Sequence, residues 1–123
     1  MYELMIDEFG IDIDGTIERL DYLADLGVNC IELMPISNVA LTVDWGYLPI
    51  GYFGVDERFG NRKDFQKFID AAHQKNIAVI LDAVYGHTSD SFPYSYVYSP
   101  HSALSTVTVD NFEPLYRGIQ HSK

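Results

Sequence analysis

The stretch IAVILDAVYGHT, residues 77–88, decides the fold of this chain. It is a mostly apolar run of the kind that forms a strand covered on both faces of a parallel sheet. One carboxylate, Asp82, interrupts the run, and His87 follows shortly after it. An ionised side chain near a core is costly unless it is paired or stays in contact with water. The sequence therefore indicates that these side chains either form stabilising pairs or belong to a functional site at the end of this strand, and both interpretations remain open.

Two further strands and a helix precede this stretch. Residues 2–9 form a short β-prone run, and residues 28–36 form an almost continuous apolar run typical of a buried strand. Between them, apolar residues at every third position predict a helix that starts near Thr16, with Asp14 or Thr16 as its cap and Gly27 as its stop. These apolar residues are Ile17, Leu20, Leu23 and Leu26.

A second helix is predicted over residues 62–75. Asn61 can cap its start together with Asp64, and Asn76 favours a left-handed stop at its end. Its apolar residues fall at helical spacing: Phe65, Phe68, Ile69 and Ala72. The predicted order is therefore strand, helix, strand, helix, strand. Right-handed crossovers make the three strands parallel neighbours and place the helices on the outside of the sheet.

The composition is that of one soluble globular domain. The chain has 123 residues, of which 47% are hydrophobic and 21% charged, and its formal net charge is −10. Such an acidic chain repels phosphate backbones and anionic lipids, so we expect no nucleic-acid and no membrane partner. The sequence has no secretory leader and no apolar run long enough to span a membrane, so a cytoplasmic location is expected. Cys30 lies in an apolar run and is expected to be a buried, reduced thiol.

Residues with functional chemistry gather at the carboxyl ends of the predicted strands, where parallel α/β folds bind ligands. These ends hold Asp7 and Glu8, the pair Asp82 and His87, and a loop over residues 37–60. The loop is far longer than the usual connection of about 2–6 residues. It clusters four aromatic residues among glycines: Trp45, Tyr47, Tyr52 and Phe53. Exposed rings suit the flat apolar faces of sugars, so carbohydrate is the first ligand expected; the alternative is that the rings only pack the loop onto the sheet.

The segment DWGYLPIGYFGVDERFG, followed by a helix and then AVILDAVYGHT, resembles the α-amylase superfamily, glycoside hydrolase family 13. The likeness is strongest to branching-enzyme-like and trehalohydrolase-like members. The family fold is a (β/α)8 TIM barrel, and the resemblance implies an α/β chain that holds strands one to three, two helices and a following loop. Eight such units need about 250 residues, so this chain holds only part of a barrel. We assign residues 1–98 to the N-terminal part of the catalytic domain and leave residues 99–123 as an unassigned tail or divergent loop.

The resemblance implies roles for four residues. Asp82 matches the signature aspartate that supports the active-site arginine of the fourth strand in relatives. His87 matches the signature histidine that donates to the hydroxymethyl group of the sugar being cleaved. Tyr52 matches the tyrosine on which that sugar stacks, and Tyr47, in the same motif, is a further candidate for substrate binding. The ligand implied for the parent enzyme is an α-1,4-glucan or maltooligosaccharide.

The sequence departs from the family pattern at two positions. Leu48 stands where many hydrolytic members carry an aspartate, which favours a glucan-modifying relative such as a branching enzyme. Gly86 stands where calcium-dependent amylases place an asparagine ligand, so we expect no structural calcium. We also expect no other metal and no cofactor.

No catalytic residue is expected in this chain. Retaining glycosidases need two carboxylates about 5–5.5 Å apart, and the resemblance places the family's three catalytic carboxylates on later strands. Asp110 and Glu113 lie in surroundings that do not match those strands. The parent protein is therefore expected to be an α-amylase-family glycosidase or a glucan branching enzyme, and this chain alone is expected to be inactive.

Two other functions remain open. The chain can be a non-catalytic glucan-binding or structural fragment, whose unpaired strand edges and uncovered inner face favour self-association. It can also be a receiver-like domain, with magnesium at Asp7 and Glu8 and phosphate accepted by Asp82. Against the second alternative, no lysine except Lys123 follows Asp82, and such a domain needs a lysine at the end of its last strand.

The remaining polar residues are expected to have structural roles. Residues 56–58 form a charged cluster that predicts a surface ion-pair network. The four histidines lack the spacing of metal ligands. We expect His73 to pack beside the apolar stripe of the second helix, and His101 and His121 to be solvated.

Overall fold

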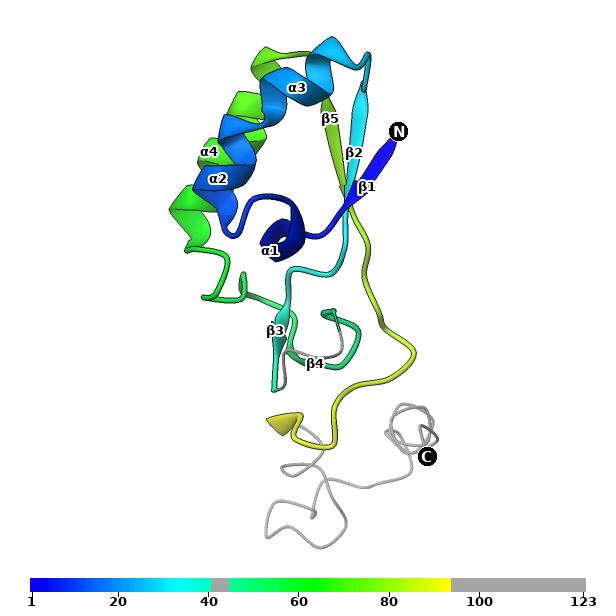
Figure 1. The fold of residues 1–123 in the computed structure, drawn as a ribbon. Helices are drawn as coiled ribbons and strands as arrows, with labels where there is room; N and C mark the ends of the chain where they lie inside the picture. The colour runs from blue at the N-terminus through cyan, green and yellow to red at the C-terminus, as the bar shows by residue number, and fades with distance from the viewer. Residues whose placement is uncertain (41–44, 94–123) are drawn as a thin grey trace, which may run out of the picture.

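The computed structural model describes residues 1–40 and 45–93, and its centre is a three-stranded sheet (Figure 1). The strands are β1 (Tyr2–Leu4), β2 (Cys30–Leu33) and β5 (Ala78–Leu81). They lie in the order β1-β2-β5, and both pairs run parallel. The predicted parallel arrangement is therefore confirmed, and all three carboxyl ends lie at one edge of the sheet.

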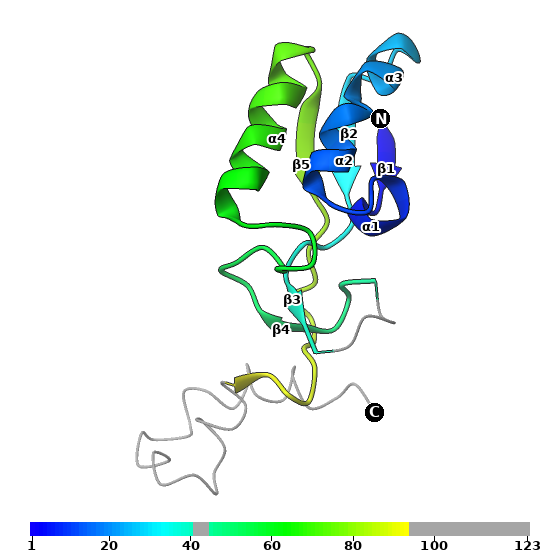
Figure 2. The same cartoon turned by 60° about the vertical axis from the view of Figure 1, so that its left-hand side comes forward.

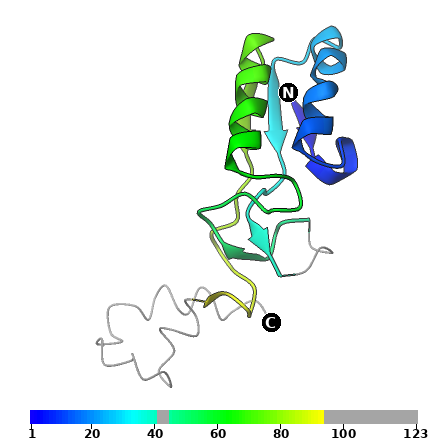
Figure 3. The same ribbon diagram turned by 90° about the vertical axis from the view of Figure 1, so that its left-hand side faces the viewer.

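Helices cover one face of this sheet. α1 (Ile6–Phe9) follows β1 directly, so most of the strand expected over residues 2–9 is helical. α2 (Ile13–Glu18) and α3 (Leu20–Asp25) lead to β2, and α4 (Arg62–Gln74) leads to β5. Seen from the helix side, α4 stands beside α2 and α3 with the strands behind them (Figures 2 and 3). No helix in the described part of the chain has the length and apolar composition needed to cross a bilayer.

The predicted first helix is in fact two short helices. Asp12 caps α2 in place of Asp14 or Thr16, because its carboxylate accepts a hydrogen bond of 2.8 Å from the N–H of Gly15. At Arg19 the backbone leaves helical geometry, with φ −97° and ψ 1°, and this separates α2 from α3. The spacing of apolar residues did not indicate this break, because both helices present their apolar residues to the same core.

The sequence correctly predicted where α4 begins and where α3 and α4 end, because contacts between neighbouring residues set these positions. Asn61 and Asp64 form a capping box at the start of α4, in which each side chain accepts a hydrogen bond from the backbone N–H of the other residue. Gly27 and Asn76 adopt the positive φ angles of 81° and 58° that end α3 and α4. Leu26, expected in the buried stripe, is 59% exposed because α3 ends before it.

A single core joins the helices to one face of the sheet. Ile31 and Leu33 of β2 and Phe68 of α4 are at most 1% exposed within it. The outer edge of β5 has no neighbouring strand among the described residues, and no described helix covers the opposite face of the sheet. Ile80 and Leu81 are consequently 43% and 51% exposed. The expectation of a last strand covered on both faces is therefore wrong for β5.

Two further burial expectations are also wrong. Cys30 alternates with the buried Ile31 and so faces the uncovered side of the sheet, where its thiol is only half-buried. His73 is exposed on α4, because the buried positions of that helix are Phe68 and Ala72. The remaining predictions concern residues outside the described part of the chain: His101, His121, Asp110, Glu113 and the tail over residues 99–123.

The long loop contains a second, two-stranded sheet. β3 (Asn38–Val39) and β4 (Pro49–Gly51) pair antiparallel and lie beyond the carboxyl ends of the central strands (Figure 1). The sequence indicated only a loop over residues 37–60, because strands of two and three residues that include a proline and a glycine give no periodic signal.

Asp56 anchors this loop. It is 4% exposed, so the predicted surface ion-pair network is in fact partly buried. Its carboxylate accepts hydrogen bonds from Arg58 Nε at 2.8 Å and from the backbone N–H groups of Arg58 and Val39 at 3.0 and 3.3 Å. Burial opposes the ionisation of this carboxyl, but these hydrogen bonds outweigh burial and hold the pKa of Asp56 below its ordinary value.

Candidate functional site

The candidate site lies at the carboxyl edge of the central sheet, where β5 meets the long loop. Asp82 follows β5 and extends its ladder, since its backbone N–H donates to the carbonyl of Leu33 at 2.8 Å. This bond holds the Asp82 backbone against β2. The four residues for which the sequence predicts site roles, Tyr47, Tyr52, Asp82 and His87, are brought together here by contacts among themselves.

Tyr47 is directly bonded to Asp82. Its hydroxyl donates to Asp82 Oδ2 at 2.7 Å. That hydrogen bond, then burial, and then the negative charges of Asp82, Glu3 and Glu32 raise the pKa of Tyr47 to about 12. The hydroxyl therefore stays protonated at neutral pH and remains a donor to the carboxylate. Glu3 and Glu32 are register partners on β1 and β2, so the phenol stands near three acidic groups.

His87 is bonded to the backbone of the same tyrosine. Its Nε2 lies 2.8 Å from the carbonyl oxygen of Tyr47, and the imidazole is half-buried. The next residues extend this contact, because the N–H of Ser89 donates to the carbonyl of Pro49 at 3.1 Å. The segment after β5 is thus fastened to the aromatic loop along its main chain.

Tyr52 occupies a different position in the site. Its hydroxyl is 3.5 Å from the carbonyl oxygen of His87, at the limit of a hydrogen bond. Its ring packs against Tyr85 and Phe92, with ring centroids 5.5 and 5.6 Å apart. Burial, followed by the neighbouring Tyr85, raises the pKa of Tyr52. Among the described residues, the ring of Tyr52 therefore packs against other aromatic side chains of this chain. These contacts help to hold the segment after β5.

A tight turn delivers Tyr47 to this place. Trp45 and Gly46 both have positive φ angles, 51° and 90°. A Cβ atom on Gly46 would lie 2.3 Å from the carbonyl oxygen of Pro35, so a side chain at this position would push the loop away from the end of β2. Trp45 itself is 58% exposed, at the rim of the site. Nothing in the sequence distinguishes Gly46 from the other glycines of the loop, because its close approach to Pro35 arises only in the fold.

The Tyr52 side of the site is aromatic. Phe53 and Tyr85 are 95% and 80% exposed. A cavity of about 330 Å³ lies beside Tyr52 and has no charged residue in its wall. It is lined by Asn38, Ile50, Gly51, Tyr52, Phe53, Gly54, Phe92 and Pro93. Exposed rings around an uncharged cavity suit a neutral ligand with flat apolar faces.

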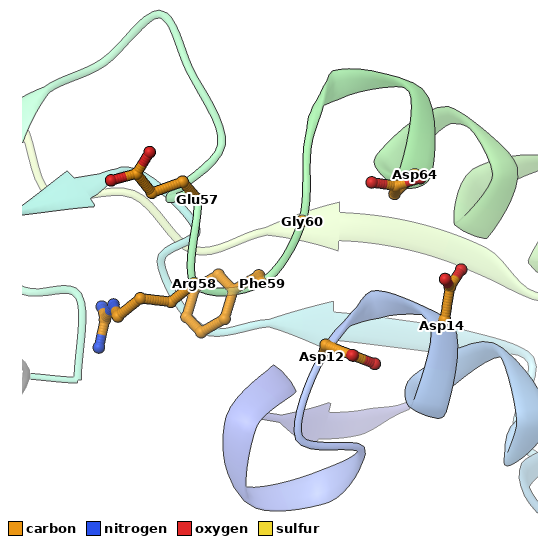
Figure 4. A pocket seen from close by; sticks show the side chains of 7 residues that line it. All are labelled: Asp12, Asp14, Glu57, Arg58, Phe59, Gly60 and Asp64. Carbon is orange, nitrogen blue, oxygen red and sulfur yellow. The ribbon is translucent and has the colours of Figure 1, made fainter.

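A second cavity, of about 220 Å³, is acidic and lies against the helices (Figure 4). Its acidic side chains include Asp12, Asp14, Glu57 and Asp64, and two of these already cap helices. Nowhere in residues 1–40 and 45–93 do three or more His, Cys, Asp or Glu side chains form a group that could hold a metal ion.

Comparison with known proteins identifies a family. The family model "Alpha amylase, catalytic domain" matches residues 6–105 of this chain. The malto-oligosyltrehalose trehalohydrolase of Mycobacterium tuberculosis (strain CDC 1551 / Oshkosh) is 39% identical over 103 residues, which are 82% of this chain and 18% of that protein. The 1,4-alpha-glucan branching enzyme GlgB of Lactiplantibacillus plantarum is 35% identical over 106 residues, which are 80% of this chain and 17% of that protein.

A solved structure gives the same picture of the fold. The crystal structure of an Anoxybacillus α-amylase matches with a TM-score of 0.75 and 28% identity, and covers 81% of this chain and 26% of that chain. This match confirms the predicted fold class, a part of a larger α/β barrel, and the described residues form no closed barrel. The chain spans about a fifth of the length of the curated relatives it matches.

Proposed function

We propose that this chain, which belongs to the α-amylase catalytic-domain family, contributes part of the glucan-binding site of a retaining glycoside hydrolase or glucanotransferase. One observation carries the proposal: Tyr47, Asp82 and His87 form a hydrogen-bonded network at the carboxyl edge of the parallel sheet. Ligands of such barrels bind at this edge. The names of the relatives, a trehalohydrolase and an α-glucan branching enzyme, favour an α-glucan ligand.

In this proposal each residue of the network has one task. Asp82 accepts the hydrogen bond of the Tyr47 hydroxyl through Oδ2 and offers its other oxygen to the active-site arginine of a later strand. His87 contacts the hydroxymethyl group of the sugar. Both tyrosines are candidates for contacting the sugar: the hydroxyl of Tyr47 is bonded to Asp82, and Tyr52, the tyrosine that the resemblance assigns to stacking, packs beside Tyr85.

We assign the bond-breaking chemistry to residues outside this chain. A retaining mechanism needs a nucleophile and an acid about 5–5.5 Å apart, and the family resemblance places both on later strands. Leu48 favours a glucan-modifying activity, branching or transfer, over simple hydrolysis. A non-catalytic glucan-binding role is the second candidate for the chain by itself, since its network can contact a sugar without any catalytic carboxylate.

The test is a titration of the labelled chain with maltotriose, followed by the backbone amide signals in NMR. We expect saturable shifts at Tyr47, Asp82 and His87, and little response to cellotriose, which has β-linkages. Tyr47→Ala and His87→Ala should weaken binding at least about tenfold, which corresponds to about 1.4 kcal/mol. Tyr22→Ala on α3 and His73→Ala on α4 are matched controls at exposed positions and should bind as the parent chain does.

The proposal fails if maltotriose produces no saturable shift, or if the Tyr47 and His87 variants bind as well as the two controls. Equal responses to maltotriose and cellotriose would leave sugar binding in place but remove the preference for α-glucans.

A further inference from the structure

Trp45 is held in a backbone conformation that suits a tryptophan poorly. Its φ angle is 51°, in the left-handed region, where a residue with a Cβ pays a steric cost that glycine avoids and asparagine tolerates. Burial does not repay this cost in full, because Trp45 is 58% exposed. The fold therefore does not by itself account for a tryptophan at this position.

The indole of Trp45 also has no partner in the described part of the chain. Within residues 1–40 and 45–93 its ring contacts no other aromatic side chain, and its Nε1–H donates to no acceptor. An indole has a flat apolar face and one hydrogen-bond donor. Both are therefore available to a ligand.

The turn that carries Trp45 is anchored beside the site. Gly46 alone separates Trp45 from Tyr47, so the Cα atoms of these two residues lie within about 7 Å of each other. Gly46 has a φ of 90° and packs so closely on the end of β2 that an added Cβ would lie 2.3 Å from the carbonyl oxygen of Pro35. The indole is therefore held at the rim on a fixed turn.

The charge beside this turn restricts the class of ligand. Acidic side chains surround the hydroxyl of Tyr47, namely those of Asp82, Glu3 and Glu32. They repel phosphates and carboxylates. A neutral pyranose suits the place, because its C–H face can lie on the indole while one of its hydroxyl oxygens accepts from Nε1–H.

We propose that Trp45 is a second sugar-contacting ring of the site, so that the site takes an α-glucan of several units in preference to a single sugar. This role rests on the proposed function, because the first sugar contact is the one assigned to the network around Tyr47. One pyranose occupies one of the two contact surfaces, whereas a longer glucan spans both and gains affinity from linking them.

The experiment uses the fluorescence of the chain, which has a single tryptophan, so that the emission reports on Trp45 alone. Maltohexaose should shift the emission to shorter wavelength in a saturable manner, because the sugar removes water from the indole. Glucose at the same concentration should leave the emission unchanged. The amide signals of Tyr47, Asp82 and His87 are followed by NMR in the same titrations.

Three variants separate the ring from the turn. Trp45→Asn removes the ring and keeps a residue that tolerates the positive φ; it should weaken maltohexaose binding at least about tenfold without lowering the urea midpoint. Trp45→Phe keeps a ring and should bind more tightly than Trp45→Asn. Tyr22→Ala, at an exposed aromatic position on α3, is the matched control and should bind as the parent chain does.

The proposal is overturned if maltohexaose saturates the amide shifts of the network while the emission of Trp45 stays unchanged, which would leave the proposed function in place. It is also overturned if glucose produces the same emission shift, or if Trp45→Asn binds maltohexaose as tightly as Tyr22→Ala. An emission change with tetramethylammonium and none with maltohexaose would replace the sugar by a cationic ligand. If neither the amides nor the emission respond to any glucan, the proposed function itself fails.

Discussion

Replacing Asp56, the buried carboxylate of the long loop, should weaken the hydrogen bonds that hold this loop in place. Asp56→Asn removes a charge that accepts hydrogen bonds from Arg58 and from the backbone of Val39, at a position that is 4% exposed. Hydrogen bonds to charged groups contribute about 1.5–3 kcal/mol, and the asparagine amide would face donors where the carboxylate accepted. We expect the free energy of unfolding to fall by about 2–3 kcal/mol at neutral pH.

The stability difference between the parent chain and Asp56→Asn should depend on pH, in a direction that follows from the pKa of Asp56. The pKa of Asp56 is lower in the folded chain than its ordinary value of 3.8. Its stabilising contribution is therefore fully present above that value and is lost as the pH falls through the lower pKa of the folded state. The stability gap between the parent chain and Asp56→Asn should thus narrow as the pH is lowered from about 7 to about 3.

Urea titrations followed by circular dichroism, at stepped pH and one fixed protein concentration, measure this gap. Asp70→Asn is the matched control, since Asp70 is an exposed aspartate on α4, and it should change stability by less than about 0.5 kcal/mol. Equal stabilities of the two variants at neutral pH would refute the anchoring role of Asp56. A gap that stays constant down to low pH would refute the electrostatic explanation.

Three further outcomes follow from the structure. Phe68→Ala should cost about 3–5 kcal/mol in a urea titration, because Phe68 is 1% exposed in the core; a loss below about 1 kcal/mol would contradict that core. Asp82→Ala should lower the pKa of Tyr47 from about 12 towards its ordinary value of 10.0, because both the hydrogen bond and the charge are lost; carbon-13 NMR of the tyrosine rings during alkaline titration measures this, and an unchanged value would exclude Asp82 as the cause. The chain alone should self-associate through the open edge and exposed side chains of β5, and replacing Ile80 and Leu81 by lysine should reduce this association in sedimentation equilibrium; a parent chain that is monomeric at every concentration would contradict it.

The parts of the fold that follow local rules could be predicted from the sequence. Asn61, Asp64 and Asn76 fix the ends of α4 through bonds and backbone angles within a few residues of each other. The parallel order of the strands followed from the handedness of the crossovers. The break between α2 and α3 could not be predicted in this way, because it occurs at Arg19, inside an apolar pattern that continues across it.

The sequence also identified which residues meet in the site, but not how they meet. The motif placed Tyr47, Asp82 and His87 at one edge of the sheet. The bond from His87 to a main-chain carbonyl has no sequence signature, because any residue at position 47 has that carbonyl. Likewise, the buried state of Asp56 depends on β3, a two-residue strand that only long-range pairing reveals.

The pattern of contacts between bound maltotriose and the chain, measured as intermolecular nuclear Overhauser effects, tests the proposed sugar site at the level of single residues. We expect contacts from the sugar ring hydrogens to the ring of Tyr47, and from the hydroxymethyl hydrogens to the ring of His87. Contacts confined to Phe53 and Trp45, with none to Tyr47 or His87, would show that the sugar does not bind at this site.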